Sequence, residues 1–167
     1  MNEAKIIHAR NWATLYHKGQ TRKYTGEPYI THPEAVGALV RDHGLSDTAV
    51  IAALLHDTVE DTNATLENVE ESFGEKVAEY VWYLTKPPAY VGNRRVRKEH
   101  DRLRLQIAPE EVRIIKFFDI YHNAKSIKEH DPEFWKEFRH ESLLMMLALD
   151  IENIESMSPY NDFIGSL

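Results

Sequence analysis

Cysteine is absent from the 167 residues of this chain. Disulfide bonds, thiolate metal ligands and a cysteine nucleophile are therefore excluded, and any bound metal must be held by histidine, carboxylate and water. The nine histidines are enough to supply such ligands.

Long apolar runs and an excess of positive charge are also missing. No stretch approaches the roughly 18 apolar residues of a membrane span, and the polar start MNEAKIIHAR does not resemble a signal peptide. The 20 Lys and Arg residues are outnumbered by 27 Asp and Glu, which gives a formal net charge of -7. We therefore expect a soluble cytoplasmic protein without membrane binding and without general affinity for nucleic acid.

Strand-like alternation is not convincing anywhere, and the apolar spacing is helical nearly throughout. At 167 residues and 43% hydrophobic content, the chain can bury one core but is short for two. The sequence predicts a single all-α domain over residues 1–167, a bundle of about seven to eight helices. Residues 154–167 are expected to form a loosely attached tail.

Capping and helix-breaking residues divide the chain into eight expected helices. The first ends near Gly19, and the second follows a loop containing Gly26 and Pro28. The third begins at Ser46 or Asp47 and contains the apolar run AVIAALLHD. By residue range, the second covers 33–42, the fourth follows the Thr65 cap, and the others cover 74–86, 94–106, 109–128 and 132–150. A mobile loop is expected over 86–93.

Four side chains are candidate ligands of a divalent metal ion. His56 and Asp57 lie where the apolar third helix reaches the surface, and His32 opens the second helix. Asp119 lies within the apolar sequence IIKFFDIY, where an unpaired carboxylate is costly to bury. A catalytic ion needs three or four protein ligands with positions left open. The alternatives are a capped helix end at His56 and Asp57, backbone bonding by His32, and an ion pair of Asp119 with Lys116.

Two acidic residues, Glu60 and Asp61, follow one turn later. They are close enough to orient or deprotonate an attacking water, or to protonate a leaving group. An acidic end of a helix is unfavourable against the helix dipole, which favours a catalytic interpretation over an ordinary solvated helix end.

Basic residues cluster in two places. Arg22 and Lys23 precede the Gly/Pro loop, where they could stack on a base or hold phosphates, or simply be exposed. The stretch 93–104 contains six of the 20 basic residues: Arg94, Arg95, Arg97, Lys98, Arg102 and Arg104. Three of them, Arg94, Lys98 and Arg102, share a helical face that fits a polyphosphate. A solvated face is the alternative, because acidic residues are interleaved.

Taken together, four strings of the sequence resemble a known family. They are RKYTGEPYITHP at 22–33, ALLHDTVEDT at 53–62, FGEKVAEYV at 73–81 and KFFDIYHN at 116–123. The chain resembles the HD phosphohydrolase superfamily over about residues 9–150. It is most similar to small stand-alone alarmone hydrolases, which are related to the hydrolase domain of RelA/SpoT-type enzymes.

The resemblance implies manganese-dependent hydrolysis of guanosine alarmones such as ppGpp, with release of pyrophosphate from the 3′ position to leave GDP or GTP. It implies that one manganese ion is bound by His32, His56, Asp57 and Asp119. Glu60 and Asp61 would activate water and handle protons.

The resemblance also implies contacts to the nucleotide. Arg22 and Lys23 would pack against guanine, Asn123 would meet the ribose, and Ser126 stands where the family usually has threonine. The family usually has Arg or Lys directly after the metal-binding aspartate, whereas this chain has Ile120. That departure bears on substrate preference more than on metal binding.

Other functions remain open at this point. One is a nucleoside 5′-monophosphatase of the same superfamily, and another is a binding protein that sequesters a nucleotide or a partner protein. A third is an alarmone hydrolase, acting on guanosine or adenosine alarmones, that serves as antitoxin to a toxic synthetase. Whether the chain forms a homo-oligomer is left open as well.

Overall fold

The computed structural model describes residues 2–87 and 89–151, and within these ranges every regular element is helical. An isolated bridge between Thr21 and Pro28 joins the two sides of the loop that follows the first helix. The expected all-α fold is confirmed. The expected loose tail, residues 154–167, lies outside the described residues.

Eight of the described helices correspond to the expected segments. They are α1 Glu3–Tyr16, α2 Thr31–Asp42, α3 Asp47–Leu55, α5 Leu66–Phe73, α6 Glu75–Leu84, α7 Arg94–Gln106, α8 Glu110–His130 and α9 Pro132–Leu149. Two short elements were not expected, the one-turn helix α4 Thr58–Asp61 and the 3-10 helix η1 Ala89–Val91. In the part of the chain that the structure describes, no helix is long and apolar enough to cross a membrane.

Side-chain caps explain where several helices begin. The Ser46 side chain accepts a hydrogen bond from the backbone of Ala49, which identifies Ser46 as the cap of α3. Thr65 and Asn68 form a reciprocal capping box at α5, and Asp131 caps α9. These local signals were readable in the sequence.

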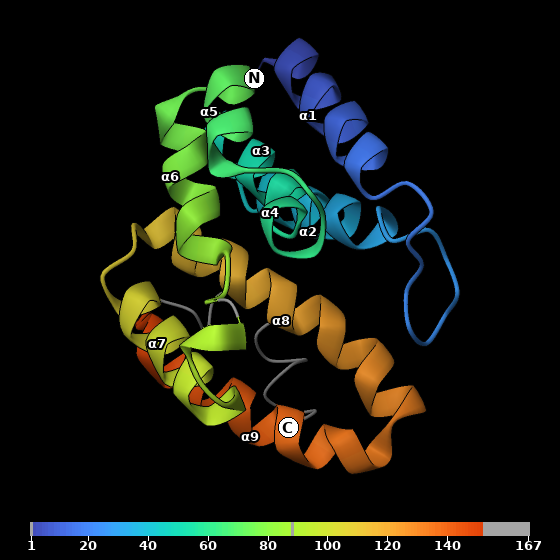
Figure 1. Cartoon of the computed structure of the whole chain (residues 1–167), viewed down its shortest axis with the longest axis vertical. Coiled ribbons are helices and arrows are strands. Elements are labelled where there is room, and N and C mark those ends of the chain that lie inside the picture. The colour runs from blue at the N-terminus through green and yellow to red at the C-terminus, as the bar shows by residue number, and fades with distance from the viewer. Residues whose placement is uncertain (1, 88, 152–167) are drawn as a thin grey trace.

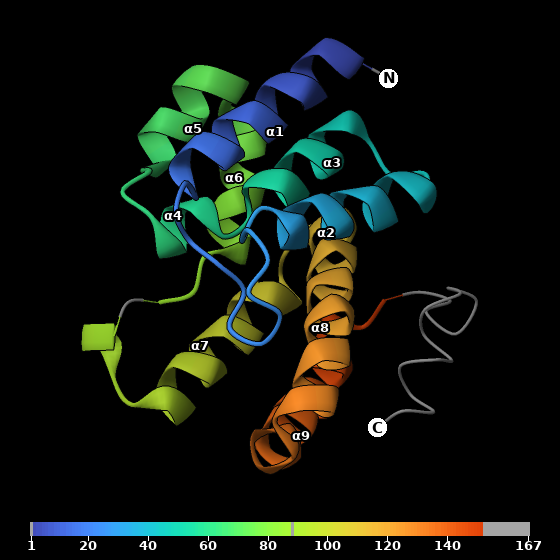
Figure 2. The ribbon, with the colours of Figure 1, turned by 90° about the vertical axis from the view of Figure 1, so that its right-hand side faces the viewer.

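The core is built around α3, which is buried from Ala49 through Leu55. It packs against α1, α2, α6 and α8. Figure 1 shows α1 to α6 gathered in one half of the molecule, with α8 crossing the middle and α7 and α9 on its other side. The view from the side, in Figure 2, gives the same division. His56, which follows α3 directly, lies 3.8 Å from Asp119 of α8, so the end of α3 faces α8.

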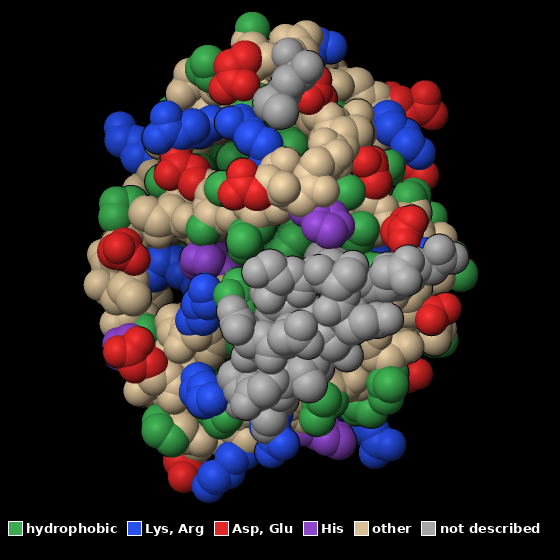
Figure 3. All heavy atoms as spheres, turned by 180° about the vertical axis from the view of Figure 1, so that it is seen from behind, with side chains coloured by type: hydrophobic (Ala, Val, Ile, Leu, Met, Phe, Trp, Pro, Cys, Tyr) green, Lys and Arg blue, Asp and Glu red, His purple; other side chains and the backbone are tan. Residues whose placement is uncertain are grey.

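Surface charge is mixed. On the face shown in Figure 3, basic and acidic side chains are interspersed among the described residues.

Candidate metal centre and catalytic cleft

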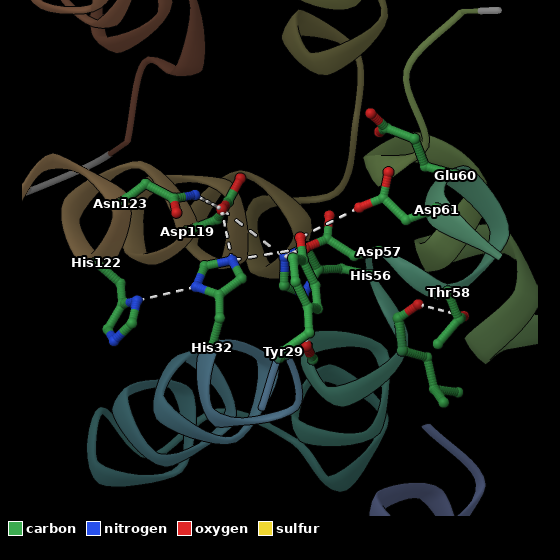
Figure 4. A network of polar contacts seen from close by, with 12 residues as sticks. Tyr29, His32, His56, Asp57, Thr58, Glu60, Asp61, Asp119, His122 and Asn123 are labelled. Atoms are coloured by element: carbon green, nitrogen blue, oxygen red, sulfur yellow. Dashed lines mark hydrogen bonds and ion pairs between the residues drawn. The ribbon is translucent and has the colours of Figure 1, made fainter. Parts of the chain in front are cut away.

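His32 lies in the first turn of α2, which begins at Thr31, two residues earlier than expected. Its side chain is fully buried. The ring nitrogen Nε2 is 3.1 Å from Oδ1 of Asp119, and the other ring nitrogen, Nδ1, is 2.9 Å from Nδ1 of His122. His122 therefore orients the His32 ring so that Nε2 points toward Asp119 of α8 (Figure 4).

His56 directly follows α3 and is also buried. Its Nδ1 lies 2.7 Å from the carbonyl oxygen of Ala53, so Nδ1 carries a proton and donates it to that carbonyl. The other nitrogen, Nε2, is buried without a hydrogen-bond partner, although it faces Asp57 at 3.1 Å and Asp119 at 3.8 Å. A buried polar atom without a partner is costly. A cation placed between these atoms would satisfy Nε2.

Asp119 uses its two carboxylate oxygens for different partners. Oδ2 accepts a hydrogen bond from Lys116 Nζ at 2.9 Å. Oδ1 faces His32 and accepts a hydrogen bond from the side chain of Asn123 at 2.7 Å. The ion pair with Lys116, considered as an alternative to metal binding, is thus present, but it leaves Oδ1 turned toward the histidines.

The four expected ligands are brought together from three separate parts of the chain. His32, His56 and Asp119 can each offer a ligand atom within 4.8 Å of the others. Asp57 Oδ2 lies 3.1 Å from His56 Nε2 and 3.6 Å from His32 Nε2. Nitrogen and carboxylate oxygen without thiolate is a donor set suited to a hard or borderline divalent ion, so the residues present fit a metal centre.

Electrostatics within the cluster support the same interpretation. Burial raises the pKa of Asp119, but Lys116 and His32 outweigh burial and hold this pKa well below its usual range. For Asp57 the attraction of His56 likewise outweighs burial and lowers the pKa. Burial lowers the pKa of His56, yet the two carboxylates together raise it to about 10. A cation bound here would therefore compete with a proton on His56.

The acid pair, Glu60 and Asp61, lies on α4, which begins directly after the candidate metal ligands His56 and Asp57. Glu60 is paired with Lys86, with Nζ at 3.0 Å from its carboxylate and the Lys86 backbone nitrogen at 3.3 Å. Asp61 is exposed, and its carboxylate lies 3.1 Å from the hydroxyl of Tyr29. Although the residue is exposed, partial desolvation of its carboxylate by the surrounding protein, together with the charges of Asp57 and Glu60, raises the pKa of Asp61, which favours proton uptake.

A cavity of about 1230 Å³ joins these groups to the other half of the molecule. Its lining includes two of the candidate metal ligands, Asp57 and Asp119, both members of the acid pair, and cations of α7. Those cations are Arg94, Arg95, Lys98 and Arg102. The expected polyphosphate face of α7 and the expected catalytic groups thus share one cleft.

Most of the α7 cations that line the cavity already have acidic partners within the protein. Arg94 contacts Glu141 at 2.7 Å and Glu137 at 3.1 Å, and Lys98 contacts Glu141 at 3.2 Å. Arg102 pairs with Glu99. The alternative of a paired, solvated face is therefore correct in part. Arg95 also lines the cavity, and among the described residues it has no ion-pair partner.

The remaining expected nucleotide contacts are placed unequally. Arg22 donates a hydrogen bond to the side-chain oxygen of Asn123 at 2.6 Å, so these two lie together, and Asn123 lines the cavity. Lys23 is exposed and paired with Asp131 at 3.2 Å. Ser126 bonds to the backbone oxygen of Asn123 at 3.2 Å. Arg22, Lys23 and Ser126 are not among the residues that line the cavity.

Three polar residues of the site were not identified from the sequence: Tyr29, Lys86 and His122. Tyr29 and His122 lie inside the strings GEPYITHP and KFFDIYHN, so those strings contained the signal. Lys86 precedes Pro87 in a segment expected to be a mobile loop, and no local pattern connects it with Glu60.

The HD domain family model matches residues 9–145 of the chain. This chain belongs to the HD domain family. Its relatives include the guanosine-3′,5′-bis(diphosphate) 3′-pyrophosphohydrolase MESH1 of Xenopus tropicalis, 39% identical over 142 residues that cover 81% of this chain and 76% of MESH1. The bifunctional (p)ppGpp synthase/hydrolase SpoT of Escherichia coli K12 is 35% identical over 131 residues, which cover 76% of this chain and 18% of SpoT. The resemblance inferred from the four sequence strings is confirmed.

Solved structures give the same fold. The structure of a metazoan ortholog of SpoT that hydrolyses ppGpp superposes on this HD domain protein with a TM-score of 0.79 at 24% identity, covering 98% of this chain and 93% of the other. A protein from Listeria monocytogenes EGD-e superposes with a TM-score of 0.69 at 24% identity, covering 86% and 96%.

Proposed function

We propose that this HD domain protein hydrolyses guanosine 3′,5′-bis(diphosphate) alarmones, releasing pyrophosphate from the 3′ position to give GDP or GTP. The observation that carries the proposal is the shared cavity, which joins metal-ligating side chains, an acid pair and a cationic wall. The activities named for MESH1 and SpoT support the same reaction.

One divalent ion, for which we propose manganese, would be held by His32, His56, Asp57 and Asp119. When bound, such an ion supplies Lewis-acid polarisation of a phosphoryl oxygen. The buried, unpartnered Nε2 of His56 and its convergence with three further donor groups support this assignment.

Asp61 would accept a proton from the attacking water and, with Glu60, return one to the ribose. The water oxygen forms a bond to the phosphorus next to the 3′ oxygen, and the bond between that phosphorus and the 3′ oxygen breaks. One proton leaves the water and one is required by the 3′ oxygen, so the carboxylates end unchanged. Glu60 is held by Lys86, whereas Asp61 has a raised pKa, which makes Asp61 the stronger candidate for base.

The cations of α7 would bind the phosphates, and Arg22 with Asn123 would contact the nucleoside. Ile120 is apolar and lines the cavity at the position where the family usually has a cation. We propose that Arg95, which lines the cavity and has no ion-pair partner among the described residues, supplies positive charge that Ile120 does not.

The test is turnover of a nucleotide panel by the purified protein with manganese, scored by product identity. Pyrophosphate with GDP from ppGpp, or with GTP from pppGpp, is the expected result. Orthophosphate from GMP or dAMP with ppGpp untouched would instead identify a nucleoside 5′-monophosphatase. No turnover of any nucleotide, together with binding of ppGpp, would identify a binding protein.

A further inference from the structure

The hydroxyl group of Tyr29 bridges the metal centre and the acid pair. Its oxygen is 2.7 Å from Oδ2 of Asp57 and 3.1 Å from Oδ2 of Asp61 (Figure 4). Tyr29 comes from the loop before α2, 28 and 32 residues away from these carboxylates in the sequence. The single hydroxyl hydrogen can be donated to either carboxylate oxygen, so one group lies within hydrogen-bond distance of both carboxylates and sets their separation.

Asp61 needs such support because α4 is too short to hold it. This helix has four residues, and its N-cap residue, Asp57, makes no capping hydrogen bond. A single turn fixes several backbone angles for one hydrogen bond, so it is not stable by itself. The Asp61 backbone oxygen accepts a hydrogen bond from the Gln20 side chain at 2.7 Å. Gln20 and Tyr29 flank the same loop, so one segment of the chain holds both the backbone and the side chain of Asp61.

Tyr29 is itself held in place. Its ring packs against the buried His17 ring, with centroids 4.8 Å apart, and the Arg22 guanidinium lies 5.6 Å from the ring centroid. The His17 ring is fixed in turn by a contact of 2.7 Å between Nδ1 and the side-chain oxygen of Gln20. These contacts make Tyr29 a rigid support for the groups at its hydroxyl.

The two carboxylates depend on Tyr29 to different extents. Asp57 is already held by His56 at 3.1 Å and His32 at 3.6 Å. For the Asp61 carboxylate, by contrast, Tyr29 is the one hydrogen-bond partner within the described residues. Removal of the hydroxyl should therefore release Asp61 and leave Asp57 in place.

We propose that Tyr29 is a positioning residue that fixes the Asp61 carboxylate relative to Asp57, so that the proton acceptor stays beside the reacting phosphate. This role rests on the proposed function, because it presupposes that Asp61 handles a proton. It assigns to Tyr29 an effect on kcat that is distinct from metal binding.

Tyr29→Phe keeps the ring and removes only the hydroxyl. We expect kcat for ppGpp to fall by about 10–100-fold, as is typical when a partner that orients a reacting side chain is lost. KM and the affinity for manganese measured by calorimetry should stay the same. The matched control is Tyr80→Phe, which removes a hydroxyl bound to Glu111 at 2.9 Å, outside the cavity. It should leave kcat unchanged.

A double mutant separates action through Asp61 from any other effect. In an Asp61→Asn background, Tyr29→Phe should cause no further loss of kcat, because the group it positions is already disabled. A full additional loss would overturn the proposal, as would a loss of manganese affinity in Tyr29→Phe with kcat restored at saturating manganese. Either result would place the effect of Tyr29 elsewhere.

A readout without substrate makes the proposal independent of turnover. The carboxyl carbon resonance of Asp61, assigned by comparison with Asp61→Asn, should shift in Tyr29→Phe and stay in place in Tyr80→Phe. The positioning role would be overturned if the Asp61 resonance did not move in Tyr29→Phe and the kcat of this variant equalled that of Tyr80→Phe. If the wild-type protein does not hydrolyse ppGpp, the proposed function fails. The resonance then tests the positioning of Asp61 by itself. A shift in Tyr29→Phe would support that positioning, and an unmoved resonance would overturn it.

Discussion

Two regions of the cleft are built in contrasting ways. One is the metal end, formed by His32, His56, Asp57 and Asp119, and the other is the α7 wall, formed by Arg94, Arg95, Lys98 and Arg102. The four candidate metal ligands are at most 8% exposed, and each lies within or beside a buried helical stretch. The α7 cations are partly exposed, as the Arg94 side chain at 46% illustrates, and most are paired with acids of the protein. Core packing therefore fixes the geometry at the metal end. At the α7 wall, the phosphates of a substrate would have to compete with the glutamate carboxylates that already form ion pairs with these cations.

The largest effect is expected at the metal end. Asp57→Asn or Asp119→Asn removes a charged ligand while keeping the side-chain shape, and either change should abolish metal binding and ppGpp hydrolysis. Calorimetry with manganese and a turnover assay measure the two losses.

Asp101→Asn provides the control for a buried charge outside the metal centre. Asp101 is 1% exposed and paired with Arg104, so loss of its charge should lower the stability of the protein but leave metal binding unchanged. A chelator-treated, metal-free wild-type protein that hydrolyses ppGpp at full speed would contradict the assignment of the metal centre.

The acid pair should show the next largest effect. Asp61→Asn and Glu60→Gln should keep metal and nucleotide binding, yet lower kcat by about 10²–10⁴-fold as expected for a lost acid-base group. We expect the larger loss for Asp61, because Glu60 is neutralised by Lys86. If both variants lost the metal, Glu60 and Asp61 would be identified as metal ligands, and the metal end would include α4.

Metal affinity should depend on pH through His56. In the absence of a cation its pKa is raised from 6.5 to about 10, so the nitrogen that should bind the metal is protonated at neutral pH. A metal ion must displace that proton, and the apparent affinity should rise by up to about tenfold per pH unit in the neutral range. Calorimetry in buffers of different ionisation enthalpy would count the released proton. A pH-independent affinity would exclude His56 as a protonated competitor.

The smallest effect is expected at the α7 wall. Arg95→Ala removes a cation that has no ion-pair partner among the described residues, so no buried charge is left behind. KM for ppGpp should rise by a few-fold, corresponding to about 0.2–1 kcal/mol for an exposed contact, with kcat unchanged. Arg139→Ala, an exposed position of α9 outside the cavity lining, is the matched control. Equal KM values for the two variants would remove Arg95 from the phosphate site.

The same contrast explains what the sequence could predict. Helices and caps follow from local spacing, and the candidate ligands His32, His56, Asp57 and Asp119 were identifiable because polar residues interrupt apolar runs. The one-turn helix α4 escaped prediction because four residues cannot display a helical period. The partners of the α7 cations escaped as well, since Glu141 is 47 residues from Arg94 and no local pattern links them.

The spacing of polar residues along helix α8 determines which side chains face the cleft. Lys116, Asp119 and Asn123 lie three and four residues apart, so they share one face of the helix and form one chain of side-chain contacts. Each residue of an α-helix turns the chain by about 100°. Insertion or deletion of one residue between Asp119 and Asn123 would carry Asn123, and with it the contact to Arg22, away from Asp119. Length changes in this stretch should therefore be far less tolerated than substitutions of its exposed side chains.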